Sequence, residues 1–411
     1  MKKNLLVLTD AFVPPAYVPR VRTMCDVLVE HGWNVLVCTE EIRDVQANFV
    51  HSYPIISVPY YHCKGLWGKV EWGCKFLLNL FCDYKGYFFT QQYHRLLKNK
   101  PIDAVFCSSF NTFPLTVAAR IAKQRRVPLH VDLRDMVEQC VGHQYNKHKR
   151  WAGKYLYECL NTIYQAQNLK RRNRVLRYAN SLSSVSPWHV KWLKAFNDNV
   201  TLIYNGYDQH IFQPKDVRST SFKIIYTGMI YGRQMQDPTL LLEALQRMVQ
   251  QGRMPEELEC HFYVKPETQT QLKIYAEECG LKAYIYCHDY VPPQDIPSLL
   301  HDASVVLVLS NTTSPSGPYG IMTTKFYEAL GVEKPVLCVR SDEDQLARLI
   351  RETEAGIAAV HVDEVESFIL EKYAEWKQYG FTRQRVNPIE KEKYCRQRQA
   401  FQFITCLNNM Q

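Results

Sequence analysis

Short runs of Val, Ile and Leu alternate along the chain with helical patterns, and this alternation limits the possible folds more than any other feature. Such runs are typical of buried strands in a parallel sheet whose strands are joined by crossover helices. The first series covers residues 4–10, 34–40, 103–109, 127–133 and 181–186, and the second covers 223–228, 258–264, 284–290, 304–310, 335–340 and 356–360. The sequence therefore predicts an α/β protein with two doubly wound, Rossmann-like sheets, each with its ligand loops at the carboxyl ends of its strands.

The boundary between the two predicted domains falls in residues 204–221, where turn-forming residues and a proline interrupt the apolar pattern. We expect an N-terminal domain over residues 1–205 and a second domain over residues 206–387. A last helix follows the second domain, and we expect it to pack back on the first, so residues 388–411 are assigned there. Two such domains are expected to face each other across a cleft, which is the natural place for an active site.

The composition is that of a globular protein outside the membrane: of 411 residues, 46% are hydrophobic and 22% are charged. The apolar run that follows Met1 is too short for a signal peptide. The most apolar later stretch, residues 76–89, is interrupted by Asp83 and Lys85 and falls short of the roughly 20 residues that a membrane span needs. The sequence thus predicts a protein without a transmembrane helix.

The 14 cysteines include no C-x-x-C pair, and several of them, such as Cys38, Cys107 and Cys338, lie in strand-like runs. This pattern predicts reduced core thiols of a cytosolic protein and no zinc site. The net charge of +9 favours anionic partners. Charge alone leaves nucleotides, lipid headgroups and nucleic acid open.

Residues 320–337, GIMTTKFYEALGVEKPVL, place Lys325 in the first turn of a predicted helix and Glu328 one turn later. A cation at the positive end of the helix dipole is unfavourable by about 0.3 to 1 kcal/mol. We therefore expect an anion beside Lys325. The alternative is an exposed Lys–Glu pair, which would contribute only roughly a few tenths of a kcal/mol.

Four passages of the second domain, in their correct order, resemble the retaining nucleotide-sugar glycosyltransferases of GT-B fold, specifically glycosyltransferase family 4 (group 1). The passages are VTLIYNGYDQHIF (200–212), FKIIYTGMIYGRQMQDPTLLLEAL (222–245), YCHDYVPPQDIPSLLHDASVVLVLS (286–310) and GIMTTKFYEALGVEKPVL (320–337). In the first domain, residues 6–39 are similar to the family's opening strand, loop and helix. VDLRDMVEQ (131–139) is similar to the D-x-R-D-x-W motif of a subgroup, with Val137 in place of tryptophan.

The resemblance implies that a nucleotide diphosphate lies against the helix N-terminus near Thr323 and Thr324 and beside the ammonium of Lys325. Glu328 would then accept hydrogen bonds from the ribose hydroxyls. Arg233, in the loop after the first strand of this domain, would neutralise the leaving diphosphate, with an exposed loop arginine as the alternative.

The remaining donor contacts that the resemblance implies involve mainly backbone groups. Gly228 would let the backbone approach the donor closely. The nucleobase would stack over the loop of Tyr290 and Val291. Many relatives carry an acidic residue where this chain has Gly320, so the donor sugar would be held by backbone groups of Gly320, Ile321 and Met322.

In the first domain, Asp135 is the candidate for steadying positive charge on the reacting carbon or orienting the acceptor hydroxyl, with Arg134 and Asp132 as neighbours. The alternative is an Asp–Arg pair that only organises the end of the strand. Pro15 and Tyr17 replace the glycine-rich first loop of relatives and suggest a loop that shapes the acceptor site. The predicted catalytic residues are thus Asp135, together with Arg233 and Lys325 of the second domain.

Two segments of the first domain suggest contact with an anionic membrane. Residues 147–177 combine many basic residues with aromatic ones, and residues 64–81, KGLWGKVEWGCKFLLNLF, are aromatic and apolar. The alternative is a solvated charged helix together with ordinary core aromatics.

These features predict a retaining glycosyltransferase that needs no metal or other cofactor and moves a sugar from a nucleotide diphosphate donor to a glycan. The acceptor is expected to be lipid-linked, in bacterial surface polysaccharide synthesis, and the enzyme to be cytoplasmic and peripheral on the inner face of the membrane. No D-x-D metal motif stands in the expected place. The alternatives are a nucleotide-sugar 2-epimerase of the same fold and a non-catalytic, degenerate transferase. No helix-turn-helix or RNP signature favours nucleic acid.

Overall fold

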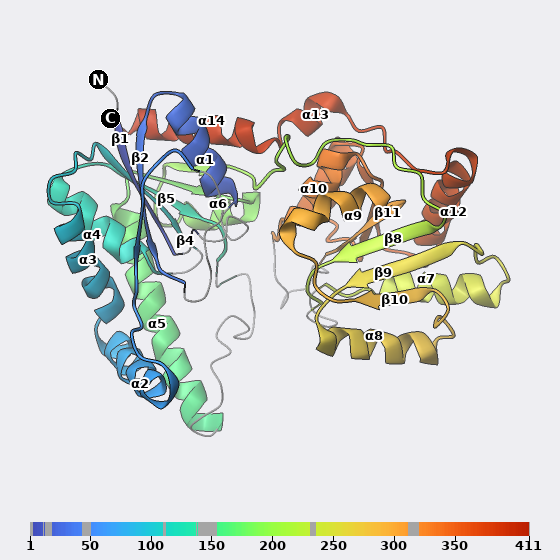
Figure 1. Cartoon of the computed structure of the whole chain (residues 1–411), viewed down its shortest axis with the longest axis horizontal. Helices are drawn as coiled ribbons and strands as arrows, with labels where there is room; N and C mark the ends of the chain where they lie inside the picture. Colours follow the sequence, from blue (N-terminus) through green and yellow to red (C-terminus); the bar gives the residue numbers. More distant parts are fainter. Residues whose placement is uncertain are drawn as a thin grey trace. The chain divides into compact units, whose positions relative to one another are not determined.

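The computed structural model divides the chain into two compact units, Met1–Tyr204 with Gln399–Gln411, and Asn205–Arg398 (Figure 1). None of the described helices combines the length and the apolar character that crossing a bilayer requires. The structure describes residues 3–10, 12, 19–42, 51–109, 112–136, 138, 154–230, 236–310 and 320–410, and of residues 154–158 and 161 it describes only the backbone.

The described part of the first unit is built on a seven-stranded parallel sheet with the order β3-β2-β1-β4-β5-β6-β7. Its strands are β1 (Asn4–Thr9), β2 (Asn34–Glu40), β3 (Ile55–Val58), β4 (Ala104–Ser109), β5 (Leu129–Leu133), β6 (Ser181–Ser184) and β7 (Val200–Leu202). The strand order reverses between β1 and β4, which is the arrangement of a doubly wound α/β fold. The carboxyl ends of β1, β4 and β5 therefore meet at one edge of the sheet.

Helices cover both faces of this sheet and bury two apolar cores. The helices are α1 (Pro19–Glu30), α2 (Gly65–Phe81), α3 (Tyr84–Leu96), α4 (Leu115–Arg125), α5 (Lys154–Tyr178), α6 (Pro187–Leu193) and α14 (Arg396–Asn409). The C-terminal helix α14 packs with α1: Phe403 and Leu407 lie in the same buried cluster as Val21 and Leu28. The predicted packing of the last helix on the first domain is confirmed.

The second unit repeats the architecture with a six-stranded parallel sheet in the order β10-β9-β8-β11-β12-β13 of the described residues. Its strands are β8 (Phe222–Thr227), β9 (Leu258–Tyr263), β10 (Ile285–His288), β11 (Val305–Leu309), β12 (Val336–Val339) and β13 (Gly356–Ala359). The order reverses between β8 and β11. Both halves of the predicted fold class, two doubly wound Rossmann-like sheets, are confirmed.

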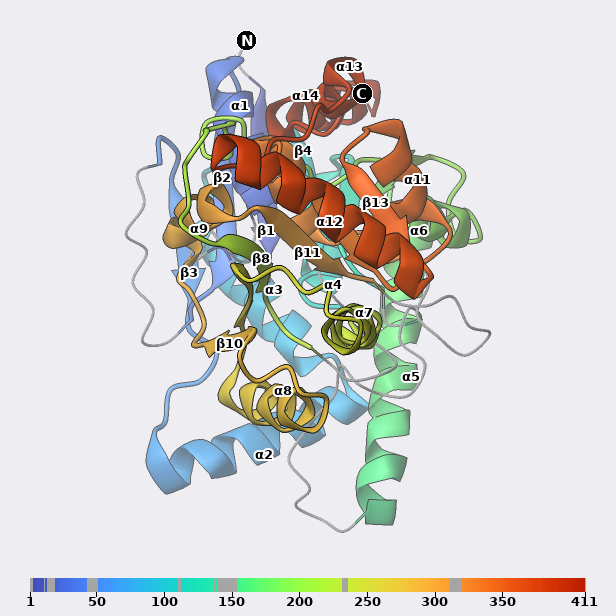
Figure 2. The ribbon, with the colours of Figure 1, turned by 90° about the vertical axis from the view of Figure 1, so that its right-hand side faces the viewer.

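The helices of the second unit are α7 (Thr239–Gln250), α8 (Pro266–Glu278), α9 (Ile296–Asp302), α10 (Thr324–Val332), α11 (Gln345–Glu352), α12 (Val362–Tyr379) and α13 (Pro388–Glu392), with a short 3-10 turn at Pro293–Asp295. Leucines of α7, with Leu272 of α8 and Phe368 of α12, share one core with alternate side chains of β8, β9 and β11. Figure 2 shows α7 and α12 side by side in front of this sheet.

Three details differ from the sequence prediction. Residues of β3 and β7 were not expected as strands; both are short and lie at the edges of the sheet. The last predicted helix is interrupted between α13 and α14, because Tyr207 bridges to this stretch. The backbone N of Tyr207 donates to the carbonyl of Tyr394 (2.9 Å), and the N of Arg396 donates to the carbonyl of Tyr207 (2.8 Å). These bonds hold Tyr394 and Cys395 in an extended pairing that a helix excludes.

Candidate active site

Helix α10 begins at the carboxyl edge of the second sheet, where the strand order reverses. Its N-cap residue, Thr323, has extended backbone angles, and the Thr323 side chain accepts no capping hydrogen bond. The first backbone N–H groups of an α-helix have no partner within the helix. With no side-chain cap from Thr323, this N-terminus offers N–H donors and a positive dipole to an anion.

Lys325 lies directly over the end of β8, in space that Gly228 leaves open. A Cβ atom built on Gly228 would lie 2.4 Å from Cε and 2.7 Å from Nζ of Lys325. Gly228 also has φ +137°, a conformation that residues with a side chain rarely adopt. The structure thus brings together two of the predicted donor residues, Gly228 and Lys325, which are far apart in the sequence.

Glu328, one turn after Lys325, is the second half-buried charge of this helix. Burial lowers the pKa of Lys325, and the carboxylate of Glu328 opposes that shift. Burial likewise raises the pKa of Glu328, and Arg396 and Lys325 oppose it. Among the described residues, neither side chain forms a hydrogen bond or an ion pair, so the alternative of a paired Lys–Glu couple is not what the structure shows. The Lys325 ammonium lies over the Tyr226 ring, 5.8 Å from its centroid, and burial destabilises both charges without a hydrogen bond or ion pair from the described residues to offset it.

Arg396 is a neighbour of this site that the sequence analysis missed. It is the first residue of α14, its side chain is 6% exposed, and its Nε finds no hydrogen-bond partner among the described residues. Burial lowers the pKa of Arg396, and Glu328 and Asp208 are the carboxylates that oppose that shift. No sequence motif signals this role, because Arg396 reaches Glu328 only through the pairing of its own backbone with Tyr207.

Gly206, which lies in the passage VTLIYNGYDQHIF, makes that pairing possible. Gly206 has φ +67°, and a Cβ atom on it would lie 2.5 Å from the carbonyl oxygen of Tyr394. Tyr207 in turn packs on Gly331 of α10, where a Cβ would lie 2.9 Å from Cδ2 of the Tyr207 ring. Gly206 and Tyr207 therefore connect helix α10 to the stretch that leads into α14.

The segment before α10 explains why glycine stands at position 320. Gly320 has φ +64°, so an acidic side chain at this position would be strained. Met322 is buried, Ile321 is half-buried and Thr324 is exposed. Since the Met322 side chain points into the core, only its backbone groups are available to a ligand. Arg233, the other predicted catalytic cation, lies outside the described residues.

Tyr290 and Val291 follow β10 at the same edge of the sheet, and the Tyr290 side chain is 63% exposed. The start of their loop is anchored by Gln269 of α8. The Gln269 side-chain amide donates to the carbonyl of His288 (3.0 Å) and to Oδ1 of Asp289 (2.9 Å). An exposed ring on an anchored loop is suited to stacking against a nucleobase.

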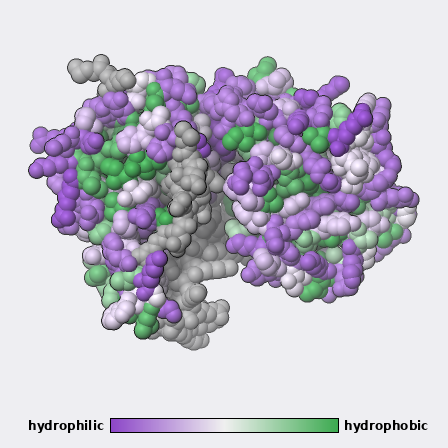
Figure 3. All heavy atoms as spheres, in the orientation of Figure 1, coloured by the Kyte–Doolittle hydropathy of each residue, from purple (hydrophilic) through white to green (hydrophobic). Residues whose placement is uncertain are grey.

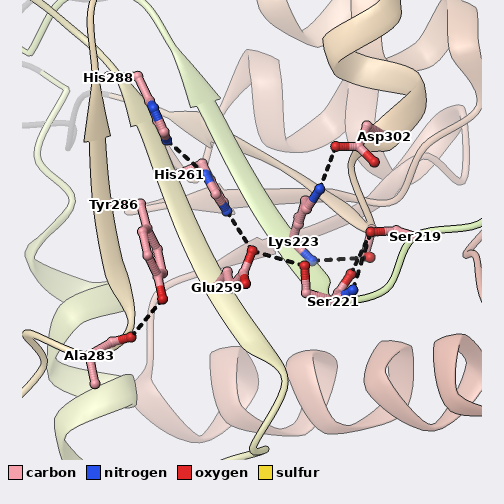
Figure 4. A network of polar contacts seen from close by, with 10 residues as sticks. Ser219, Ser221, Lys223, Glu259, His261, Ala283, Tyr286, His288 and Asp302 are labelled. Atoms are coloured by element: carbon pink, nitrogen blue, oxygen red, sulfur yellow. Dashed lines mark hydrogen bonds and ion pairs between the residues drawn. The ribbon is translucent and has the colours of Figure 1, made fainter.

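A ladder of aromatic rings extends from this loop along one face of β9 and β10 (Figure 4). Ring centroids lie 5.0 Å apart for His261 and Tyr286, 5.1 Å for His261 and His288, and 4.5 Å for His288 and Tyr263. Nδ1 of His261 is 2.8 Å from Nε2 of His288, and its Nε2 is 2.9 Å from a carboxylate oxygen of Glu259. Within the described residues no group of three or more His, Cys, Asp or Glu side chains is placed to hold a metal ion. The stacked rings and the contact between His261 and His288 link strand β9 to strand β10.

In the first unit, Asp135 lies just beyond the end of β5 and is half-buried. Burial raises the pKa of Asp135 to about 6, with Arg134 and Arg20 lowering it and Asp10 raising it. No described residue makes a hydrogen bond to the Asp135 carboxylate. A carboxylate with this pKa can act as a proton acceptor near neutral pH.

The neighbours of Asp135 are held by the protein itself. Arg134 donates to Oδ1 of Asp10 at 2.5 Å and ties β5 to the end of β1. Asp132 is fully buried and accepts from Arg20 (3.0 Å), Ser108 (3.0 Å) and Ser183 (2.7 Å). Asp132 and Arg134 therefore fit the alternative that the motif organises the end of the strand. Asp135 does not take part in these hydrogen bonds and ion pairs among the described residues. Pro15 and Tyr17 lie outside the described residues.

Residues 208–374 match the family model described as "Glycosyl transferases group 1". The matched stretch contains the second-unit site around Gly228, Lys325 and Glu328. No curated protein matches the chain significantly.

Solved structures resemble the chain over its full length. Sucrose-phosphate synthase (tll1590) from Thermosynechococcus elongatus is 12% identical with a TM-score of 0.64, and the match covers 100% of this chain and 99% of that one. Anabaena Alr3699/HepE in complex with UDP is 14% identical with a TM-score of 0.63 and 100% coverage of both chains. The lipopolysaccharide outer core galactosyltransferase WaaB, in its apo form, is 12% identical with a TM-score of 0.58, covering 99% of this chain and 100% of that one.

At these identities the structural likeness shows the fold, which is GT-B, and the family model supplies the chemistry. The two doubly wound sheets are consistent with this fold. The uncapped N-terminus of α10 and Lys325 lie within the part of the chain that the family model matches. Residues 208–374 therefore form a region of the group 1 glycosyl transferases within a chain of GT-B fold.

Proposed function

We propose that the donor's diphosphate binds at the N-terminus of α10, where backbone N–H groups near Thr323 and Thr324 and the ammonium of Lys325 hold it. The ribose hydroxyls donate to the carboxylate of Glu328. One observation carries this proposal: Lys325 and Glu328 are half-buried, oppositely charged and without hydrogen-bond partners among the described residues. Burying unpartnered charges is unfavourable, and a ligand with an anionic end and two hydroxyls would satisfy both.

The other donor contacts follow from the same edge of the sheet. The nucleobase stacks at Tyr290 and bonds to the backbone near Val291, and Gly228 lets the chain approach the phosphates. The donor sugar lies against backbone groups of Gly320, Ile321 and Met322, because the left-handed backbone at Gly320 disfavours a longer side chain.

The proposed transfer proceeds with retention of configuration and without a metal ion. The bond between the anomeric carbon and the phosphate oxygen breaks, and a bond to the acceptor oxygen forms on the same face of the sugar. The leaving phosphate oxygen takes the acceptor's proton. Negative charge grows on the β-phosphate, and Lys325, together with Arg233, stabilises it.

The proposed acceptor side is the first unit, with residues 1–205 and the C-terminal helix, and the donor side is the second. Asp135 steadies positive charge at the reacting carbon or orients the acceptor hydroxyl, Arg134 holds the strand end in place, and Pro15 and Tyr17 shape the acceptor loop. The acceptor is a lipid-linked glycan in bacterial surface polysaccharide synthesis, met at the cytoplasmic face of the membrane. The likeness to WaaB, described as a lipopolysaccharide outer core galactosyltransferase, supports this choice.

A screen with UDP, GDP, ADP and CDP tests the donor site first. Binding is measured by titration calorimetry and checked by the melting temperature, which a nucleotide raises when it binds only the folded state. One nucleotide should bind to the wild type and bind much more weakly to Lys325→Met and Glu328→Gln. Equal affinity in all three proteins, or no binding by the wild type, would contradict the site.

Turnover of the nucleotide sugar then tests the reaction. Proton NMR of the product should show the anomeric configuration of the donor, at a rate that EDTA does not change. Incubation of the donor without acceptor should give no epimer, and an epimer would identify the protein as a 2-epimerase instead. Tight nucleotide binding with no turnover on any lipid-linked acceptor would identify a degenerate transferase.

A further inference from the structure

Helix α2 of the first unit turns most of its large apolar side chains away from the core. Leu66, Trp67 and Phe81 are 75%, 74% and 80% exposed, and Leu80 is its only buried residue. Figure 3 shows hydrophobic side chains at the surface over α2, at the lower end of the first unit. An exposed apolar surface of this kind on a folded unit marks a site of interaction.

The exposed residues form one continuous stripe. At 3.6 residues per turn they fall on about one third of the helix circumference and run for about 22 Å along its axis. The members of the stripe are Leu66, Trp67, Val70, Cys74, Leu77, Leu78 and Phe81. Spacing of this kind normally marks the buried side of a helix, and here it faces outward.

The opposite side of α2 is held firmly, so the outward direction of the stripe is fixed. The ring of Phe76 stacks on Trp72 and on Tyr164 of α5, each at 5.4 Å between centroids. Glu71 accepts hydrogen bonds from the backbone N of Cys63 (2.8 Å), and Lys75 donates to Glu71 (2.7 Å). Both figures of the fold show α2 beside α5 (Figures 1 and 2).

The charges around the stripe are positive. Lys64 and Lys69 are exposed, stand on either side of the stripe at its N-terminal end, and form no ion pair within the described residues. The only carboxylate in residues 64–81 is Glu71, which is engaged by Lys75 and by backbone N–H groups. On the neighbouring helix α5, Lys170 and Arg174 are exposed as well.

Some of the basic side chains in residues 147–177 contact other parts of the protein. Arg172 is 1% exposed and pairs with Glu138, and Arg171 donates to the carbonyl of Asn79 at 2.8 Å. Arg172 therefore does not contribute to a charged surface. The positive surface consists of the residues that flank the stripe.

We propose that α2 lies in the headgroup region of an anionic lipid bilayer, with its stripe buried at the boundary of the acyl chains. Lys64 and Lys69 contact lipid phosphates, and Trp67 lies at the interface, where an amphipathic ring is favoured. A second copy of the chain fits this surface less well, because symmetric pairing gathers like charges around one interface. The proposed contact with a bilayer rests on the proposed function in one respect: it would bring the active site close to a lipid-linked acceptor.

Co-sedimentation of the 411-residue chain with phosphatidylcholine vesicles, with and without phosphatidylglycerol, tests the proposal. The wild type should sediment with the anionic vesicles and much less with the neutral ones. Removing each lysine, as Lys64→Gln and Lys69→Gln, should weaken binding to anionic vesicles by about fivefold per lysine. The double variant Trp67→Ser/Phe81→Ser should weaken it by at least about tenfold.

Ile389→Ser is the matched control, because Ile389 is 73% exposed on α13 and lies outside the stripe. It should sediment as the wild type does. A wild type that stays in solution, or a stripe variant that binds as the wild type does, would overturn the proposal. So would sedimentation velocity without lipid that shows a wild-type dimer and a monomeric Trp67→Ser/Phe81→Ser variant.

Nucleotide binding separates failure here from failure of the proposed function. The stripe variants should bind UDP, or whichever nucleotide the screen identifies, as the wild type does. Nucleotide binding without vesicle binding overturns only the docking surface. Vesicle binding without nucleotide binding leaves the surface in place and overturns the donor site.

Discussion

Lys325 occupies the space that a side chain on Gly228 would fill: a Cβ at position 228 would lie 2.7 Å from the lysine Nζ. Gly228 directly follows strand β8, and Lys325 lies in the first turn of α10, far along the sequence. The glycine therefore fixes where the ammonium can lie. A change at either residue acts on the same charge.

Gly228→Ala should displace the Lys325 ammonium and weaken UDP binding by about tenfold, or ~1.4 kcal/mol, measured by calorimetry. Gly252→Ala is the matched control: Gly252 also has a positive φ, but a Cβ there meets no atom within 4 Å. The control should lose some stability and keep its affinity for UDP. If both variants bind UDP as the wild type does, Lys325 does not contact the phosphates.

Glu328→Gln should remove the preference for ribose over deoxyribose. The wild type should bind UDP about tenfold more tightly than 2′-deoxy-UDP, because a hydrogen bond to a carboxylate contributes about 1.5 to 3 kcal/mol. In the variant, the two ligands should bind nearly alike. A preference that survives the substitution would place the ribose elsewhere.

Arg396→Met should raise the pKa of Glu328 further above its ordinary value, because Arg396 is the first of the two cations that hold it down. An ionised Glu328 accepts hydrogen bonds more strongly than a protonated one, so UDP affinity should fall at a higher pH on acidification than in the wild type. The readout is the dissociation constant measured across a pH series.

The control for Arg396 is Arg398→Met on the same helix, since the Arg398 side chain is 61% exposed and its pairing with Glu392 spans 3.5 Å. Its pH profile should match that of the wild type. Identical profiles for all three proteins would show that Arg396 does not act on Glu328.

Asp135→Asn should change the pH dependence of transfer. The raised pKa of about 6 means that the carboxylate forms as pH rises through that value, so wild-type kcat/KM should rise over the same range. The variant should be slow at every pH and show no such step. Unchanged UDP binding would locate the loss in the transfer step.

The same pKa predicts a stability effect with a definite sign. A carboxyl whose pKa is raised on folding holds its proton longer in the folded state, so between about pH 4 and 6 stability falls as pH rises. Above that range, Asp135→Asn should unfold at a higher denaturant concentration than the wild type. Below about pH 4 the two proteins should be alike, and a variant that is less stable at pH 8 would contradict the burial argument.

The fold was predictable because its strands are continuous apolar runs. Those of β1 and β11, for example, are buried on both faces of their sheets, and such burial leaves a clear sequence signal. The edge strands β3 and β7 were missed since they are short and only partly buried. The break before α14 depends on backbone bonds to Tyr207, which no local pattern announces.

The second-unit site was predictable from Gly320 to Glu328, because these residues are contiguous in the sequence. A lysine at the positive end of a helix dipole indicated that an anion binds beside it. Arg396 was not, because its relation to Glu328 is purely tertiary. The direction of a side chain was equally hidden: periodicity marks the stripe of α2 but does not say that Leu66 and Phe81 face outward. Nor does charge show that Arg172 is buried against Glu138.

Helix α14 belongs to both units, since its first residues fall in Asn205–Arg398 and the rest in the unit that Gln399–Gln411 completes. A stop codon at position 396 would therefore remove residues from both units. It would remove Phe403 and Leu407 from the core around α1 and would remove Arg396, whose charge opposes the raised pKa of Glu328. Helix α14 is therefore a structural part of both units, and its loss would remove contacts from each of them.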